Sequence, residues 1–237
     1  MDRSFIEKIE EMAQPHIIEE NGYKYTDKRL SVVATPKVST IEFNTLRALT
    51  ELIKKEVGRF TAPILVNVRD HKTVEVHTGI ESLDRSREQP YVSTAELITI
   101  RFDQWLDYES MMIMLKSRFV ETPALTDTIQ LLGTITDEQC AQATDDGFTQ
   151  TVVVKKGIAM KGNKVVKPII KLKPYRTFNE VEQPESEFLL RLREGGGVAL
   201  FEADGGAWKL EARHNIAEYI KNELSELIDS GTVIVTE

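Results

Sequence analysis

The chain has 237 residues, of which 41% are hydrophobic and 29% are charged, so it can bury a sizeable core and has the composition of a soluble globular protein. Its formal net charge is −8 at pH 7. No apolar run approaches the roughly 20 residues that a membrane-spanning helix needs, and the first residues lack the apolar stretch of a secretory signal. The only cysteine, Cys140, cannot form an internal disulfide, and we therefore expect a cytoplasmic protein that makes no membrane contact.

The first part of the chain, residues 1–37, has the signals of a helix followed by a β-hairpin. Ser4 begins a capping-box pattern in front of an amphipathic run, and Pro15 ends that run. The pair Asn21-Gly22 lies between two short candidate strands, where it favours a tight turn. These residues predict an N-terminal arm, which contacts another subunit or packs on the protein's own core.

The next part predicts a helix, a hairpin and a second helix. Ser39 begins another capping-box pattern, which predicts that a helix starts directly after it. Apolar residues alternate with polar ones on both sides of residues 70–72, as in a β-hairpin. Asp103 or Asp107 opens the second helix, whose run Met111–Met114 is apolar on more than one face and is therefore buried in the core or in an interface.

Two further helices are predicted after these. Thr122 and Pro123 stand in the cap-then-proline order that opens a helix, and Gly133 is expected to end it. Thr136 begins a third capping-box pattern, so another helix is expected from there to about Gly147. The stretch from Glu121 to Asp146, which we call the acidic block, is expected to be helical and has no lysine or arginine. It is a candidate partner surface for a basic segment. Its six acidic residues are Glu121, Asp127, Asp137, Glu138, Asp145 and Asp146.

The segment from Phe148 to Phe178 is basic in an otherwise acidic chain. It contains no acidic residue, and without it 22 basic residues face 38 acidic ones. Lysines on an extended ribbon neutralise phosphates and give salt-dependent binding without sequence preference, so this segment is a candidate nucleic-acid contact. Two other interpretations stay open: lysines that protect an exposed strand edge from aggregation, and a contact with the acidic block of a neighbouring subunit. The eight basic residues are Lys155, Lys156, Lys161, Lys164, Lys167, Lys171, Lys173 and Arg176.

The last part of the chain predicts an antiparallel sheet. Strands are expected over residues 149–160 and 165–177, joined by a turn at residues 161–164 that contains glycine and asparagine. Three more short strands follow, the last of them at residues 207–213, and a helix and a final strand complete the chain. The short loops favour an antiparallel meander over alternating strands and helices.

Together these elements predict an α+β fold: an antiparallel β-meander of about five strands flanked by helices, with an N-terminal arm. The expected organisation is the arm at residues 1–37, a helix–hairpin–helices half at residues 38–147, and a half with the meander and the C-terminal helix at residues 148–237. We expect residues 38–237 to form one compact unit and the protein to be a homo-oligomer.

No catalytic, metal or cofactor site is predicted, and we expect a protein that is not an enzyme. Asp70-His71 resembles a fragment of the HD hydrolase signature but lacks the further histidine and aspartate residues on helices. The glycine runs at residues 195–197 and 205–206 match neither GxxxxGK[ST] nor GxGxxG, so we expect turns there. The four histidines lack the spacing of converging metal ligands; they are His16, His71, His77 and His214.

Several stretches of the chain resemble the YfdQ-like family of bacteriophage and prophage proteins, a family of unknown function. They are the strand or turn at residues 66–71, the loop at 87–91, the central helix, the basic β region and the Arg-x-Arg strand at 191–193. The resemblance implies a phage or prophage origin, a bacterial host cell, and an accessory role near replication or recombination functions. The family defines no catalytic residues, so none is implied for this chain.

We therefore expect a phage or prophage accessory protein that acts by binding and self-association rather than by catalysis. Its Lys-rich hairpin is expected to contact DNA, or a host or phage protein in a replication or recombination complex. Two alternatives stay open: a self-assembling, shell-like structural protein of a phage, and an inhibitor of a host defence system.

Overall fold

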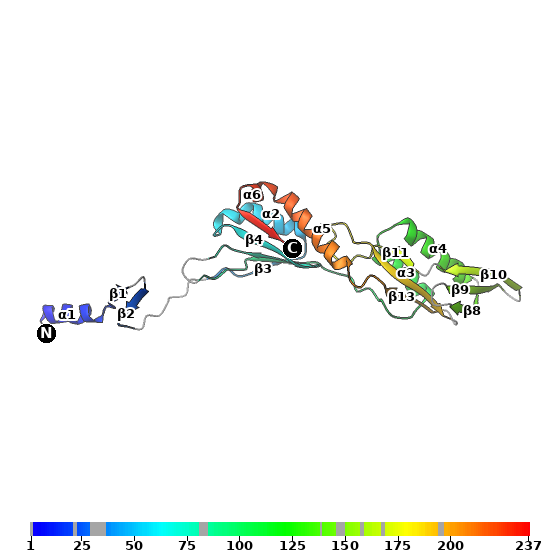
Figure 1. Cartoon of the computed structure of the whole chain (residues 1–237), viewed down its shortest axis with the longest axis horizontal. Helices are drawn as coiled ribbons and strands as arrows, with labels where there is room; N and C mark the ends of the chain where they lie inside the picture. Colours follow the sequence, from blue (N-terminus) through cyan, green and yellow to red (C-terminus); the bar gives the residue numbers. More distant parts are fainter. Residues whose placement is uncertain are drawn as a thin grey trace. The chain divides into compact units, whose positions relative to one another are not determined.

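The computed structural model of the chain confirms the predicted α+β class (Figure 1). It describes the backbone of residues 2–20, 23–28, 37–80, 85–137, 139–145, 150–156, 159–166, 169–193 and 197–237, and their side chains except Tyr23 and residues 135–166. The chain divides into two compact units, Met1–Lys37 and Val38–Glu237. Within the described residues, no helix is both long and apolar enough to cross a membrane.

The first unit contains one helix and one two-stranded sheet. Helix α1 spans Arg3–Ala13, and β1 (Ile17–Glu20) pairs antiparallel with β2 (Tyr23–Thr26). The predicted helix and the pairing of the two strands are thus confirmed. Ser4 does not cap the helix, because the helix begins one residue earlier and Asp2 is its N-cap. The predicted turn at Asn21-Gly22 lies outside the described residues. None of the described side chains of this unit is buried, so its apolar residues form no core of their own.

The second unit begins and ends in a mixed five-stranded sheet with the strand order β14-β4-β5-β6-β3. The inner strands pair antiparallel, whereas β14 runs parallel to β4 and β3 runs parallel to β6. The hairpin predicted around residues 70–72 is confirmed as β4 and β5, and the predicted final strand is β14. The strands span Ile41–Phe43 (β3), Ile64–Asp70 (β4), Thr73–His77 (β5), Tyr91–Thr94 (β6) and Val233–Thr236 (β14).

Helices cover one face of this sheet and enclose the first hydrophobic core (Figure 1). Alternate residues of β4, namely Ile64, Val66 and Val68, are fully buried against them, as the period of two in a strand requires. The helical segments of this layer are α2 (Leu46–Glu56), the 3₁₀ turn η1 (Val57–Arg59), α5 (Trp208–Glu223) and α6 (Ser225–Asp229).

The start of α2 differs from the prediction. The N-cap is Thr45, whose side chain accepts a hydrogen bond from the backbone N–H of Ala48 at 3.3 Å. The residues just after Ser39 form β3 instead of a first helical turn. Pairing with β6 outweighs the local capping pattern, because it satisfies backbone groups of both strands at the sheet edge.

A second, antiparallel sheet lies under the second hydrophobic core, with the order β11-β12-β13-β7. Helices α3 (Tyr108–Arg118) and α4 (Pro123–Asp137) pack on it. Both predicted helix starts are confirmed: Asp107 caps α3, and Pro123 opens α4. The strands span Leu106–Asp107 (β7), Ile169–Leu172 (β11), Ser186–Arg193 (β12) and Gly197–Glu202 (β13).

Helix α4 continues through Gly133, where an end was predicted. Its neighbour Leu132 is fully buried in the second core. Packing of this kind outweighs the roughly 1 kcal/mol that a glycine costs inside a helix. The helix predicted from Thr136 to Gly147 is wrong, because residues Gln139–Asp145 form strand β8.

Strand β8 belongs to a third sheet with the order β10-β9-β8, whose strands β9 (Gln150–Lys156) and β10 (Ala159–Val166) pair antiparallel. The turn predicted at residues 161–164 is wrong, since these residues lie inside β10. Lys156 pairs with Ala159 at the end of the ribbon, and the register shifts between Met160 and Gly162, as in a β-bulge. The predicted meander is therefore divided between two sheets.

The strand predicted at residues 207–213 is also wrong, because these residues form the start of α5. Gly205 and Gly206 take positive φ angles of 62° and 83° and turn the chain into this helix. Trp208, Ala212 and Ile216 are buried at a spacing of four residues. Apolar and polar residues alternate over residues 208–213, and this strand-like pattern concealed the helical period.

Candidate anion-binding site

The structure places the Lys-rich part of the basic segment on two paired strands. Lys155 and Lys156 end β9, and Lys161 and Lys164 lie in β10, which is an edge strand of its sheet among the described strands. Lys167 lies outside the described residues. The ribbon expected from the sequence is thus present, although its turn is displaced.

The other basic residues of the segment lie beside carboxylates of the same chain. The ammonium of Lys171 is 3.7 Å from a carboxylate oxygen of Glu187, and that of Lys173 is 2.5 Å from Glu182. The Glu182 carboxylate raises the pKa of Lys173. The charges of these two lysines are therefore partly neutralised within the chain.

Arg176 is buried, with 6% of its surface exposed, and does not lie on the outer surface. Its guanidinium donates to Glu202 and to the hydroxyl of Ser186, and it stacks on the ring of Trp208. Burial lowers its pKa to about 10, so it still carries its charge at neutral pH. Its place in the fold is that of a structural residue rather than a surface contact.

The predicted acidic surface is spread over a loop, a helix and a strand. Strand β8 pairs antiparallel with β9, with Gln139 opposite Lys155. The second half of the acidic block therefore forms a strand and not the predicted helix. This strand pairs with the basic ribbon of the same chain. Glu121 is exposed in the loop before α4, and Asp127 is exposed on α4. Asp137 is the last residue of α4, and Asp145 is the last residue of β8. The other two acidic residues, Glu138 and Asp146, lie outside the described residues.

Three of the described histidines take part in pairwise side-chain contacts, whereas His16 is exposed in the first unit. His71 packs edge-on against Trp208 at 4.8 Å between ring centres, and burial lowers its pKa. A ring nitrogen of His77 is 3.6 Å from Glu75, and one of His214 is 3.6 Å from Glu237. Within the described part of the chain, no group of three or more histidine, cysteine or acidic side chains converges as metal ligands would.

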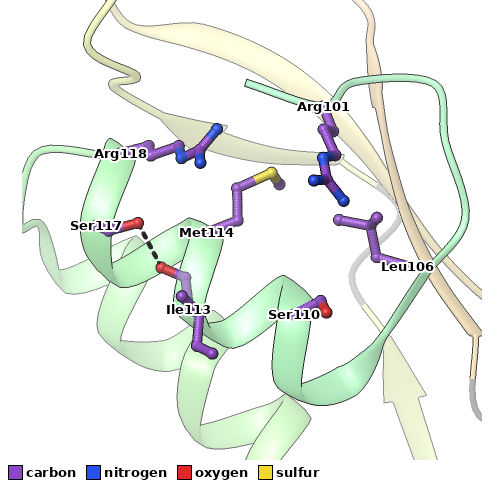
Figure 2. A pocket seen from close by; sticks show the side chains of 7 residues that line it. All are labelled: Arg101, Leu106, Ser110, Ile113, Met114, Ser117 and Arg118. Carbon is purple, nitrogen blue, oxygen red and sulfur yellow. Dashed lines mark hydrogen bonds between the residues drawn. The ribbon is translucent and has the colours of Figure 1, made fainter. Parts of the chain in front are cut away.

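A hollow of about 170 Å³ lies beside α3, and two arginines face it (Figure 2). Figure 2 shows the guanidinium groups of Arg101 and Arg118 directed toward each other, with the side chain of Met114 between them. The residues that line the hollow are Arg101, Leu106, Ser110, Ile113, Met114, Ser117 and Arg118.

Two neighbouring phenylalanines explain why these arginines come together. Each arginine directly precedes one: Phe102 follows Arg101 and Phe119 follows Arg118. The two rings meet edge-to-face at 6.4 Å between centres in the second core. The backbone carbonyl of Arg118 also accepts a hydrogen bond from the N–H of Tyr175 at 3.0 Å. Packing of the rings therefore holds both arginine backbones near one place.

The start of α3 fixes the other wall of the hollow. Strand β7 pairs with β13 and ends at Asp107, whose carboxylate accepts from the backbone N–H of Ser110 at 2.8 Å and from its hydroxyl at 2.7 Å. These hydrogen bonds lower the pKa of Asp107. The hydroxyl of Ser117 donates to the carbonyl of Ile113 at 2.7 Å (Figure 2). Both serine protons are thus engaged, and the guanidinium groups remain as the donors that face the hollow.

The hollow is electropositive. Among the residues that the structure describes, no aspartate or glutamate lines it, and no carboxylate forms an ion pair with Arg101 or Arg118. Two like charges that face each other are stabilised by an anion between them. The arrangement can therefore bind an anionic group.

Sequence reasoning missed both arginines. Arg118 stands in the last turn of a helix, where a basic residue is ordinary because it interacts with the helix dipole. Arg101 lies in a segment without a clear period. The signal that could have found them is the repeated Arg-Phe pair, with an apolar residue that anchors each arginine to the core.

Known proteins give no further guide to this site. Comparison of the chain with protein-family models, with curated proteins and with solved structures finds no match. The resemblance to the YfdQ-like phage family therefore stays a prediction.

Proposed function

We propose that this protein is an accessory binding protein that holds nucleic acid by its phosphates without reading the base sequence. The observation that carries the proposal is the antiparallel ribbon of β9 and β10, whose outer strand is a sheet edge with Lys161 and Lys164 on it. Two-stranded ribbons fit nucleic-acid grooves, and lysines neutralise phosphates in a salt-dependent way. A phage or prophage origin and a role beside a replication or recombination complex are part of the same proposal.

The test is binding of duplex and single-stranded DNA at several salt concentrations. In the test variant, Lys155, Lys156, Lys161 and Lys164 are all replaced by glutamine. Binding to duplex DNA should weaken, and the slope of log affinity against log salt should fall by about 0.9 for each phosphate that a lysine no longer neutralises.

The matched control is the double variant Lys171→Gln with Lys173→Gln, which removes lysines that already lie beside Glu187 and Glu182. We expect it to bind nearly as the natural chain does. Equal binding by the natural chain and the ribbon variant would contradict the proposal and leave protection of the sheet edge as the role of these lysines.

Self-association is a second candidate function, favoured by the apolar side of α1. Phe5, Ile6, Ile9 and Met12 are 45% to 68% exposed in the structure of one chain. An isolated helix of 11 residues is marginal in water, so it gains stability by covering this side. Arg3 lies near one end of the helix and acidic residues lie near the other, so two copies that pair antiparallel bring opposite charges together.

A further inference from the structure

We propose that the hollow beside α3 is a binding site for a single terminal phosphate group, held by Arg101 and Arg118. This site goes beyond the proposed function, because it uses neither the ribbon nor any of its lysines. It is made by α3 and by the segment that leads into β7, whose residues pack on the second core.

The two guanidinium groups define the ligand's charge. They point toward each other across the hollow, and its described lining contains no acidic residue (Figure 2). A terminal phosphate carries about −1.5 to −2 charges near pH 7, which balances two guanidinium groups. A carboxylate or an internal phosphodiester carries one charge and leaves half of the positive charge unbalanced.

The guanidinium groups also define the ligand's geometry. Each presents a planar fork of N–H donors, which matches two phosphate oxygens at once. The hydroxyls of Ser110 and Ser117 already donate to Asp107 and to the carbonyl of Ile113. The two arginines therefore supply the donors, and three or four phosphate oxygens are the acceptors that two forks need.

The size of the hollow limits what else enters it. Its volume is about 170 Å³, whereas sites for drug-sized molecules measure about 300–1,000 Å³ and one water takes about 30 Å³. One phosphate group fits in this volume, and the rest of a larger molecule would lie outside it. The ligand is thus inorganic phosphate or the phosphorylated end of a longer molecule, such as the 5′ end of a nucleic-acid strand.

Apolar residues line the hollow between the arginines. Met114 is only 5% exposed and belongs to the second core, and Leu106 packs against that core. Their side chains reduce the contact of the site with water, and charge interactions are stronger where water is reduced. Phosphate binding at this site is therefore favoured over binding at scattered surface lysines.

The test titrates the full-length protein with inorganic phosphate by calorimetry, and it compares thermal unfolding in phosphate with that in chloride of equal ionic strength. Phosphate should raise the unfolding midpoint, because a ligand that binds only the folded state stabilises it. Arg101→Gln and Arg118→Gln should each weaken phosphate binding by about tenfold or more, the loss expected for a charge-assisted hydrogen-bonded pair.

Two further variants and a pair of oligonucleotides make the result decisive. Arg101→Lys with Arg118→Lys keeps the charges but loses the planar arrangement of N–H donors. It should bind phosphate more weakly than the natural chain and more strongly than a double variant in which both arginines are replaced by glutamine. Arg69→Gln is the matched control, since Arg69 is exposed and lies 2.5 Å from Glu75, and it should bind phosphate normally. A 5′-phosphorylated oligonucleotide and the same strand with a 5′-hydroxyl identify the source of the phosphate.

Preference for the phosphorylated strand, lost in both Arg→Gln variants, would assign the site to a nucleic-acid end. Equal binding of the two strands, together with phosphate binding that needs both arginines, would assign it to free phosphate. No phosphate-dependent rise of the midpoint in the natural chain, or the same rise in the Arg→Gln variants, would overturn the proposal.

Discussion

The guanidinium of Arg176 lies 3.8 Å from the centre of the Trp208 indole ring. Arg176 follows β11 in the part of the chain that builds the second core, whereas Trp208 opens α5, which packs into the first core. Next to this contact, the hydroxyl of Thr177 donates to the backbone carbonyl of His71 at 2.6 Å. The stacked pair therefore joins the elements of the two cores within the second unit.

The Arg176–Trp208 contact gives a prediction for stability. Arg176→Met removes the stack on Trp208 and leaves Glu202 and Ser186 without their donor. We expect the free energy of unfolding to fall by about 2–3 kcal/mol. This is less than the roughly 3–5 kcal/mol for breaking a fully buried ion pair, because the Glu202 side chain is 37% exposed. Urea denaturation at pH 7 measures it. Lys173→Met, which breaks a more exposed pair, should cost less than about 1 kcal/mol. Equal losses in the two variants would show that the buried stack adds nothing.

The N-terminus of α2 gives a second prediction. A carboxylate oxygen of Glu180 accepts a hydrogen bond from the backbone N–H of Leu46 at 2.9 Å. The same oxygen lies 3.5 Å from the backbone nitrogen of Arg47. It adds a negative charge to a helix end that Thr45 already caps. Glu180→Ala should lower the free energy of unfolding by about 1 kcal/mol, as the loss of a cap does. Glu180→Gln keeps an acceptor without the charge and should lose less, and a larger loss for glutamine than for alanine would contradict this assignment. Thermal unfolding of both variants compares them.

The environment of His71 gives a prediction for pH. Burial lowers the pKa of His71 below its ordinary value of 6.5, Asp70 opposes this effect, and Lys209, Lys72 and Arg176 strengthen it. Because its pKa is lower in the folded state, the unfolded chain binds the proton more readily. The stability that neutral His71 supports is present above pH 6.5 and is lost as pH falls below that value.

The measurement is urea denaturation at about pH 7.5 and about pH 5.5, on either side of the ordinary histidine pKa. His71→Gln should reduce the loss of stability between these two pH values, because the variant has no proton to take up at this position. The exposed His214→Gln serves as the control and should keep the loss seen in the natural chain. An unchanged loss in His71→Gln would show that other groups cause the pH dependence.

The apolar side of α1 gives a prediction for self-association. Ile9→Glu places a charge in the middle of the exposed stripe, where it would have to be buried between two copies. If two copies pair through α1, the molar mass from light scattering should fall to that of a single chain. Leu210→Glu is the control, because Leu210 is 69% exposed on α5 and lies outside α1. A natural chain that is already monomeric would remove this candidate function.

Local signals in the chain determined many of its elements. The 3.6-residue period of α1, the alternation around residues 70–72, the cap at Asp107 and the Thr122-Pro123 start are properties of neighbouring residues, and each is found in the structure. Such signals are readable because a helix or hairpin forms its first hydrogen bonds within a few residues.

Only the tertiary structure decided the rest. Residues 41–43 form a strand because their backbone pairs with β6. Residues 139–145 form a strand because their backbone pairs with β9. The site depends on distance in the same way: Arg101 and Arg118 face one hollow because the rings of Phe102 and Phe119 meet in the core. The sequence by itself determined the local elements and the basic character of the ribbon. Pairing of distant strands and packing of distant side chains decided which charges are neutralised and which face a hollow, because both are set by contacts between residues far apart in the chain.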